Sequence, residues 1–405
     1  MTLFITFIVI LCLSILYTLL FIHKEYFSEI KFKVKEGYNV KLVHPGVGKG
    51  AQHLTMYNNL IYVRLLEKNV NGNTIIVLKS KDNDELEIVD EFCNFIGTCI
   101  QIRGDNLYIG GPNTVYRFDI DKTSGLVSNR YEPDLIVRGL QSAEKDDSPI
   151  FIVDNNDLYL HIISPTNACQ SINNDRKTGF KGEMPCTRLK LNSSVWKFDS
   201  NKINQTLDMG ELYSTGLRHL NSLVVKDNIL YGITQGRDSL YDLYPEFYSK
   251  KDGDKLASDE LVKIEKNTNF GFPYCYWDSD SGRRKLMPEY GGDGKEEGHC
   301  NSLIDKPIAI FNNHNGPNDL IVSNNIFYVA WNGKPKPLKC DESCDRLSVD
   351  LFKIDDDFNF IDYETLIVFT KEAKTRPSGL LISIANELFI SDSVSGKIWK
   401  ILKTF

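Results

Sequence analysis

The amino-acid sequence predicts an all-β fold, a six-bladed β-propeller, with an N-terminal transmembrane helix in front of it. A short two-strand pattern recurs six times along the 405 residues. The N-terminus begins with a long run that contains no charged residue. Aromatic residues are plentiful, with 19 Tyr and 22 Phe, and such residues favour strands over helices.

Each copy of the pattern has a polar Asn/Asp turn and an aromatic–apolar strand, followed by a second strand of basic–apolar–acidic alternation. Alternation with a period of two is typical of half-buried strands, and Asn and Asp suit tight turns. The first strands are NNLIYVRL (58–65), DNLYIGG (105–111), NDLYLHII (156–163), DNILYGIT (227–234), NNIFYVAW (324–331) and NELFISD (386–392). The second strands are TIIVLK (74–79), VYRFDI (115–120), VWKFDS (195–200), LVKIEK (261–266), LFKIDD (351–356) and IWKILK (398–403).

The spacing of these copies predicts the architecture. Six copies share roughly 365 residues, about 60 each, which suits a four-stranded blade with loop insertions. The alternative is a pair of β-sandwiches, in which the paired repeats would be coincidental. Long polar insertions interrupt the pattern, and we expect them to be loops over one face of the propeller. They are residues 164–194, 239–258, 274–306 and 333–349.

The N-terminus precedes the repeats. We assign residues 1–23 to a transmembrane signal anchor, 24–40 to a stalk or a first strand, and 41–405 to the propeller. Residues 2–22 carry no charge, and a helix of about 20 apolar residues spans a bilayer. A cleaved signal peptide is the alternative, but no basic residue precedes the run and no small-residue cleavage site follows it.

Eight of the nine cysteines lie outside this apolar run. An even number of cysteines in loop-like surroundings indicates disulfides and an oxidising compartment, although spacing does not fix their connectivity. Cys340 and Cys344 form a Cys-x-x-x-Cys motif that could instead bind a metal. This alternative is weaker, because no second Cys/His pair lies near it. Sequence neighbours suggest the pairs Cys93–Cys99, Cys169–Cys186, Cys275–Cys300 and Cys340–Cys344.

Two glycosylation acceptor patterns, at Asn192 and Asn204, point to the same compartment. We therefore expect a single-pass membrane protein whose propeller is lumenal or extracellular. Four lysines between residues 24 and 35 argue against this orientation, because the positive-inside rule would keep that flank in the cytosol.

The charge of the chain excludes one class of partner. The formal net charge is −7 and the sequence pI is about 5.6. No basic stripe is present, so we expect no nucleic-acid partner. Several enzyme classes are also excluded, because the sequence has no Gly-x-Ser-x-Gly elbow, phosphate loop, His-Glu-x-x-His motif or dinucleotide fingerprint.

Residues 215–277 carry the most specific motifs. An arginine lies beside a glycine turn in GLRHL (216–220), and a strand ends in QGRD (235–238). The next strand starts with Asp259 and Glu260, which taken alone suggest a solvated strand end, and NFGFPYCYW (269–277) follows. A guanidinium suits planar anions, and carbonyls exposed beside a glycine suit a hard cation such as calcium.

This stretch resembles the soluble PQQ-dependent glucose and sorbosone dehydrogenases, and the likeness extends over about residues 45–403, with TRPSGL (375–380) as a second strong segment. The resemblance implies a PQQ and calcium site. Arg218 and Arg376 match arginines that contact the quinone, and Lys374 and Gln52 match further cofactor contacts. The backbone carbonyls of Gly236 and Arg237 match the calcium ligands.

The resemblance also exposes one departure. The family has a catalytic His before the third blade, a general base of the kind that oxidation of a hydroxyl requires. Here the matching place falls at Asp146, or at Lys145 if the gap moves by one. His219 stands where the family has Asn and is a second candidate base. His161 lies inside the next strand and is expected to be packed or to face outward.

Two functions follow from these residues. The first is a membrane-anchored PQQ-dependent aldose/sorbosone dehydrogenase-like enzyme, which oxidises a sugar or aldehyde by hydride transfer to a calcium-bound quinone. Its electron acceptor is unknown, and its activity is in doubt because the expected His is absent. The second is a non-catalytic propeller that binds glycan or protein partners.

Overall fold

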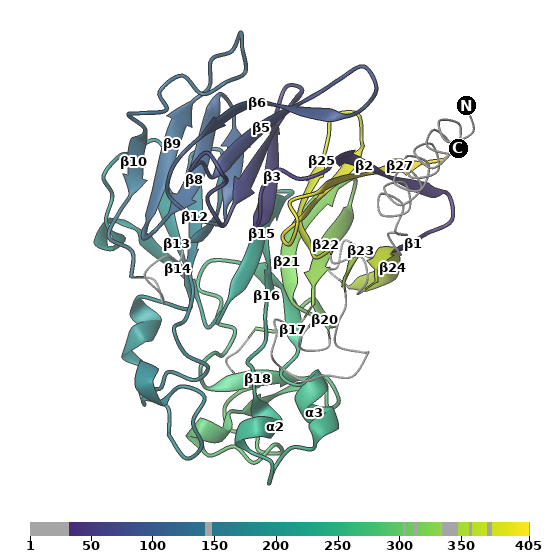
Figure 1. The fold of residues 1–405 in the computed structure, drawn as a ribbon. Coiled ribbons are helices and arrows are strands. Elements are labelled where there is room, and N and C mark those ends of the chain that lie inside the picture. Colours follow the sequence, from purple (N-terminus) through teal and green to yellow (C-terminus); the bar gives the residue numbers. More distant parts are fainter. Residues whose placement is uncertain are drawn as a thin grey trace, which may run out of the picture.

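The computed structural model describes residues 32–141, 148–302, 305–311, 315–333, 347–355, 359–370 and 375–404. These residues form six antiparallel sheets of at least four strands, arranged as the blades of a propeller (Figure 1). The predicted all-β, six-bladed fold is confirmed. Both strands of every sequence repeat are central strands of one blade.

The blades follow one another along the chain. The first contains β3 (Ala51–Tyr57), β4 (Leu60–Leu65), β5 (Ile75–Ser80) and β6 (Leu86–Phe92), and the second β7 (Ile100–Arg103), β8 (Asn106–Gly111), β9 (Thr114–Asp119) and β10 (Asp134–Val137). The third contains β11 (Ile150–Asp154), β12 (Asp157–Ile162), β13 (Ser194–Asp199) and β14 (Glu211–Thr215). The fourth contains β15 (Leu220–Lys226), β16 (Ile229–Thr234), β17 (Asp259–Ile264) and β20 (Ala309–Phe311). The fifth contains β21 (Pro317–Ser323), β22 (Ile326–Asn332), β23 (Leu347–Ile354), β24 (Phe360–Phe369) and β1 (Phe32–Val34).

The sixth blade closes the ring with both ends of the chain. It contains β25 (Pro377–Ile382), β26 (Leu388–Asp392) and β27 (Ile398–Lys403), and its outer strand is β2 (Tyr38–His44). Strand β2 pairs with β27, and β1 pairs with β24. Residues 32–34 and 38–40 are therefore strands of the propeller and not part of a stalk, which was the other possibility for residues 24–40.

The Asn/Asp turns of the repeats join the first two strands of most blades. Their residues adopt positive φ, for example 53° at Asn155, 61° at Asn228 and 63° at Asn386. Asn and Asp tolerate this left-handed conformation better than other residues with a side chain, and tight antiparallel hairpins need it. The recurring dipeptide therefore fixes where each hairpin reverses.

The first strand of every blade lines the centre of the ring. A central cavity of about 160 Å³ is bordered by residues of β3, β11, β15, β21 and β25, and by Cys99 and β7. Aliphatic and aromatic clusters fill the space between neighbouring sheets, and Trp331 and Trp399 are among the largest buried side chains. The blades thus pack face to face around a polar centre.

The insertions gather at one end of the propeller, where Figure 1 shows helices α2 (Leu240–Leu243) and α3 (Lys250–Lys255) and strand β18 (Cys275–Asp278). Strand β18 pairs with β19 (Arg283–Leu286) in a separate hairpin. Short 3₁₀ helices span Ile172–Asn174, Thr187–Lys190, Leu207–Met209 and Pro288–Tyr290. The expectation that the insertions cover one face is confirmed for their described residues.

The predicted transmembrane segment, residues 2–22, lies outside the described residues. Within the described part of the chain, no helix is long and apolar enough to cross a membrane. The N-terminal anchor stays a prediction.

Candidate functional site

The site predicted around Gly236 is formed by the fourth blade. The start of β15, the end of β16 and the start of β17 are adjacent in the sheet, because Leu220 pairs with Thr234 and Thr234 pairs with Glu260. Antiparallel pairing therefore brings the GLRH, QGRD and DE motifs to one end of one blade.

Gly236 lies at the centre of these three segments. A Cβ atom at this position would lie 2.0 Å from the carbonyl oxygen of Ala257 and 2.7 Å from that of Ser258. Only glycine permits this close approach of the two backbones. The glycine of the QGRD motif is thus required by packing against the segment that leads into β17.

Arg218 contacts the carbonyl side of Gly236. Its Nη1 donates to the Gly236 oxygen at 3.1 Å, and its Nη2 donates to Oδ2 of Asp238 at 3.2 Å. Arg176, from the 164–194 insertion, donates to the same Oδ2 at 2.9 Å. Two guanidinium groups therefore share the Asp238 carboxylate, and a second carboxylate, Oδ2 of Asp175, lies 3.8 Å from Nε of Arg176. Burial lowers the pKa of Arg218, and the Asp238 carboxylate opposes that shift.

Asp259 contacts the amide side of Gly236. Its Oδ1 accepts from the Gly236 N–H at 3.0 Å, and its side chain is fully buried. Its Oδ2 is buried and has no hydrogen-bond partner among the described residues, and the same is true of Nε of Arg218. Burial raises the pKa of Asp259 well above its usual value, and the nearby Asp238 and Glu260 raise it further.

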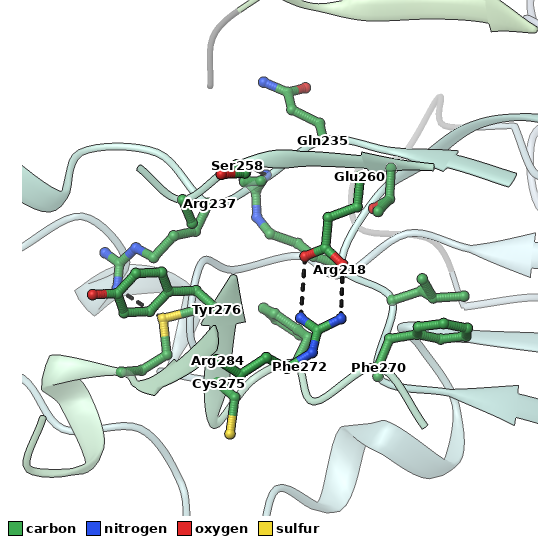
Figure 2. A pocket seen from close by; sticks show the side chains of 16 residues that line it. Arg218, Gln235, Arg237, Ser258, Glu260, Phe270, Phe272, Cys275, Tyr276 and Arg284 are labelled. Atoms are coloured by element: carbon green, nitrogen blue, oxygen red, sulfur yellow. Dashed lines mark hydrogen bonds and ion pairs between the residues drawn. The ribbon is translucent and has the colours of Figure 1, made fainter. Parts of the chain in front are cut away.

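The solvated strand end expected at Asp259 and Glu260 is wrong. Glu260 is also buried, and Arg284 of β19 donates to its two carboxylate oxygens at 3.1 and 2.7 Å (Figure 2). The insertion that carries β18 and β19 covers the start of β17. Local sequence around β17 could not indicate this burial, because Arg284 lies 24 positions downstream of Glu260.

The side chain of Arg237 points away from Gly236 into the insertions. Its Nη1 donates to Oε2 of Glu289 at 2.6 Å, and both side chains are fully buried. A cavity of about 40 Å³ lies between Arg218, Glu260, Tyr276 and Arg284 (Figure 2). That volume suits a water molecule or an ion, so an organic cofactor that contacts Arg218 would have to lie outside this cavity.

Gln52 lies on β3, the inner strand of the first blade, and Arg376 directly precedes β25, the inner strand of the neighbouring sixth blade. Oε1 of Gln52 accepts from Nδ2 of Asn318 at 2.9 Å and from Oγ of Ser378 at 3.0 Å. The Arg376 N–H donates to Oδ1 of Asp392 at 2.9 Å, which fixes the main chain of the half-buried arginine. No hydrogen bond or ion pair described here joins Gln52 or Arg376 to Arg218.

The candidate bases have different outcomes. Asp146 and Lys145, and the cofactor candidate Lys374, lie outside the described residues. His219 is half-buried. Burial, and to a smaller extent the charge of Arg218, lowers its pKa to about 4.

His161 is packed inside the propeller, which was one of the two expectations for it. Its Nδ1 lies 3.1 Å from the Ser194 carbonyl, and its Nε2 accepts from the Leu220 N–H. Burial lowers the pKa of His161 to about 3.

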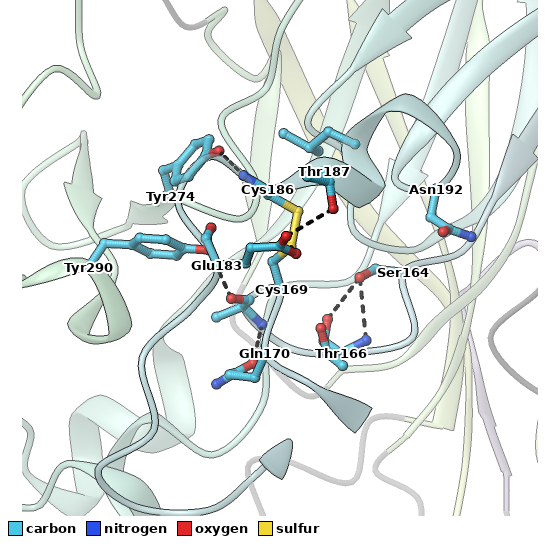
Figure 3. Close-up of a disulfide and its surroundings, with 12 residues drawn as sticks. Ser164, Thr166, Cys169, Gln170, Glu183, Cys186, Thr187, Asn192, Tyr274 and Tyr290 are labelled. Carbon is cyan, nitrogen blue, oxygen red and sulfur yellow. Dashed lines mark hydrogen bonds between the residues drawn. A yellow bond between two sulfur atoms is a disulfide. The ribbon is translucent and has the colours of Figure 1, made fainter. Parts of the chain in front are cut away.

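Two predicted disulfides are confirmed. Cys169–Cys186 closes the 164–194 insertion (Figure 3), and Cys275–Cys300 closes the insertion after β17. The predicted Cys93–Cys99 pair is wrong, and both are free thiols. Cys340 and Cys344 lie outside the described residues.

Each of the two cysteines, Cys93 and Cys99, has its own hydrogen-bond partner instead of a disulfide bond. Nη1 of the buried Arg64 donates to Sγ of Cys93 at 3.6 Å, and Sγ of Cys99 donates instead to the Phe151 carbonyl of the next blade at 3.2 Å.

The two glycosylation patterns also differ. Asn192 is buried, and its Nδ2 donates to the Gln141 carbonyl at 2.6 Å, so the amide that would carry a glycan is occupied in the folded chain. The prediction at Asn192 therefore conflicts with the structure. Asn204 is exposed, and glycosylation there stays a prediction.

Sequence reasoning missed three residues of this region. The first is Asp238, the last residue of the QGRD motif, which holds Arg218 and Arg176 together. Arg176 lies in a long insertion whose sequence gave no signal. Asn318 binds Gln52, and only its place at the start of β21, one of the inner strands, could have indicated it.

Comparison with known proteins agrees with this fold. The sequence model of the TrAA12-like family matches residues 45–336. No curated protein sequence matches the chain.

Several solved structures share the fold. A calcium structure of the Trichoderma reesei carbohydrate-active enzyme family AA12 superposes with a TM-score of 0.72 at 13% identity, covering 93% of this chain and 98% of that one. The holo form of the pyranose dehydrogenase PQQ domain from Coprinopsis cinerea gives 0.70 at 15% identity, with 92% and 97% covered. The PQQ-bound form of aldose sugar dehydrogenase from Streptomyces coelicolor gives 0.55 at 13% identity, with 91% and 99% covered. Since the family match extends over more than half of its residues, this six-bladed propeller belongs to the TrAA12-like family.

Proposed function

We propose that the protein binds PQQ and calcium beside Gly236 and acts as a sugar or aldehyde oxidoreductase. One observation carries the proposal. A buried donor without an acceptor, Nε of Arg218, and a buried acceptor without a donor, Oδ2 of Asp259, flank the same glycine. A buried polar atom without a partner is unfavourable, so the pair suits a ligand that brings both an anion and a cation.

The residues present fit these two groups. PQQ carries carboxylates, which suit Arg218 and Arg376, with Gln52 and Lys374 as further proposed contacts. Calcium prefers oxygen ligands, and both the Asp259 carboxylate and the carbonyls of Gly236 and Arg237 are of that kind. Solved structures of the same fold include a PQQ-bound enzyme and a calcium-containing one, which supports the same pair of ligands here.

The chain's own residues have separate tasks in this proposal. The bound quinone would supply the hydride acceptor, with calcium polarising it. Arg218 is oriented by Asp238, a carboxylate that Arg176 also binds. A base must take the hydroxyl proton of the sugar, and His219 and Asp146 are the proposed groups. A pKa of about 4 leaves His219 unprotonated at neutral pH but makes it a weak base.

We also propose that the propeller is lumenal or extracellular and is anchored by residues 2–22. The two disulfides support an oxidising compartment. The electron acceptor would then be a separate redox molecule outside the cytosol.

A titration of the purified full-length chain tests the proposal. PQQ absorbance is followed with and without calcium, and dye reduction is measured with a panel of aldoses and aldehydes. We expect saturable, calcium-dependent quinone binding. Binding without turnover would favour the non-catalytic propeller, and a gain of turnover in Asp146→His would locate a lost base. Absence of quinone binding would overturn the cofactor proposal.

Arg218→Ala should weaken PQQ binding by about 10- to 100-fold, because it removes charge-assisted hydrogen bonds that are each worth roughly 1.5–3 kcal/mol. The matched control is Arg103→Ala, since Arg103 also binds a carboxylate, Asp154, at 2.9 Å but on the exposed surface of another blade. Equal quinone affinity in the two variants would contradict the role of Arg218.

A further inference from the structure

A third cavity, of about 500 Å³, lies between the 164–194 insertion and the insertion after β17. Its lining includes Met184, Tyr274, Leu286, Tyr290 and the Cys275–Cys300 disulfide. It shares Cys275 with the 40 Å³ cavity near Gly236, and the buried Arg237–Glu289 ion pair stands between the two. It is therefore a separate space, and its volume is in the range of small-molecule sites.

The two tyrosines give this cavity a rigid aromatic wall. Their rings meet edge to face, with centroids 4.9 Å apart. The Tyr290 hydroxyl donates to the Ala168 carbonyl at 2.9 Å, and the Tyr274 hydroxyl accepts from the Cys186 N–H at 2.8 Å (Figure 3). Because both hydroxyls are held by the main chain of a disulfide-closed insertion, the rings are fixed and their hydrocarbon surface is left for a ligand.

The unbalanced charge at the cavity is positive. Glu289 is the one carboxylate among its described lining residues, and its oxygens are occupied by Arg237 at 2.6 Å and Gln170 at 3.3 Å. Lys181 also lines the cavity and is exposed, and it forms no ion pair with any carboxylate in the described part of the chain. Among the described lining residues, an anionic group at the rim would therefore meet one cation and no unpaired carboxylate.

We propose that this cavity binds a planar aromatic molecule that carries one acidic group. Fixed aromatic edges and faces pack best against another ring. Lys181 would bind the acidic group, with Asn269 and His299 as further polar side chains in the lining. A saccharide suits the lining less well, because most of its hydroxyls would lose their hydrogen bonds to water without replacement. The proposal is independent of quinone binding beside Gly236.

Fluorescence titration of the full-length protein tests this proposal with two probes of similar shape. 1-Anilinonaphthalene-8-sulfonate is aromatic and anionic, and N-phenyl-1-naphthylamine is its neutral counterpart. We expect one saturable site for each probe. Leu286→Trp, which fills the cavity, should weaken both by more than about tenfold, whereas Lys181→Glu should weaken the sulfonate by about tenfold and the neutral probe by less than twofold.

The matched control is Lys177→Glu, a charge reversal at an exposed lysine of the same insertion that does not line the cavity. It should leave both probes unaffected, and thermal unfolding of each variant checks that it is folded. Binding that Leu286→Trp leaves intact would place the probes elsewhere and overturn the proposal. Equal loss of the sulfonate in both lysine variants would overturn the role of Lys181, and displacement of the probes by millimolar glucose or xylose would assign the cavity to saccharides instead.

Discussion

At the residue scale, the buried carboxyl of Asp259 links pH to calcium. Burial raises its pKa, so without a cation the folded chain keeps this group protonated to a higher pH than the unfolded chain does. Its contribution to stability is therefore fully present below the unfolded pKa, near 4, and is lost as pH rises through the folded pKa. A bound calcium ion needs the carboxylate form of Asp259. Calcium binding should therefore release a proton and restore the stability that the folded protein loses at high pH.

We therefore expect calcium to raise the melting temperature of the protein more at pH 8 than at pH 5, as measured by thermal unfolding with and without the ion. Asp259→Asn should remove most of this calcium effect. The control is Asp227→Asn, which changes an exposed aspartate at the β15–β16 turn of the same blade. A calcium effect that survives in Asp259→Asn would show that the ion binds elsewhere.

At the scale of elements, local sequence predicted the strands well because each hairpin carries its own turn. The Asn/Asp pairs take the positive φ that the turns require, and all six repeats became central strands of blades. Contacts between distant segments were not predictable in this way. Cys93 and Cys99 are near in sequence, but Arg64 and Phe151 hold them apart, and Glu260 is covered by Arg284 of an insertion that follows it. The motifs thus predicted the place of the site but not its burial.

The disulfide of the 164–194 insertion should stabilise that element. Cys169 and Cys186 are 17 positions apart, and closing a loop of that size is worth roughly 3 kcal/mol in the chain-entropy account. The double variant Cys169→Ser/Cys186→Ser should therefore be cleaved faster within the insertion by a protease, since the contacts of Tyr274 and Tyr290 depend on it. Cys93→Ser, a change at a free thiol, should leave the cleavage rate unaltered, and a similar rate in both variants would contradict this role.

At the scale of the whole molecule, one buried carboxylate joins blades across the central cavity. Asp319 of the fifth blade accepts from Oγ of Ser222 in the fourth blade at 2.8 Å and from the Leu380 N–H in the sixth blade at 2.8 Å. Nε2 of His53, in the first blade, lies 3.7 Å from its Oδ1. Four of the six blades thus meet at one side chain, and the ring is held at its centre as well as by β2 at its edge.

The charge of this cluster should make closure of the ring sensitive to alkaline pH. Burial alone would lower the pKa of His53, but Asp319, with smaller effects from Cys99 and the Asn318 carbonyl, raises it to about 9 from the ordinary 6.5. The stabilisation that protonated His53 gives the folded protein is fully present below pH 6.5 and is lost as pH rises towards 9, by about 1.4 kcal/mol per pH unit.

Denaturant unfolding between pH 6.5 and 9 measures how the free energy of unfolding falls with pH, and Asp319→Asn should remove this slope. Ser222→Ala should lower stability at every pH but keep the slope, because the ion pair remains. A slope unchanged in Asp319→Asn would show that other groups set the alkaline limit of the propeller.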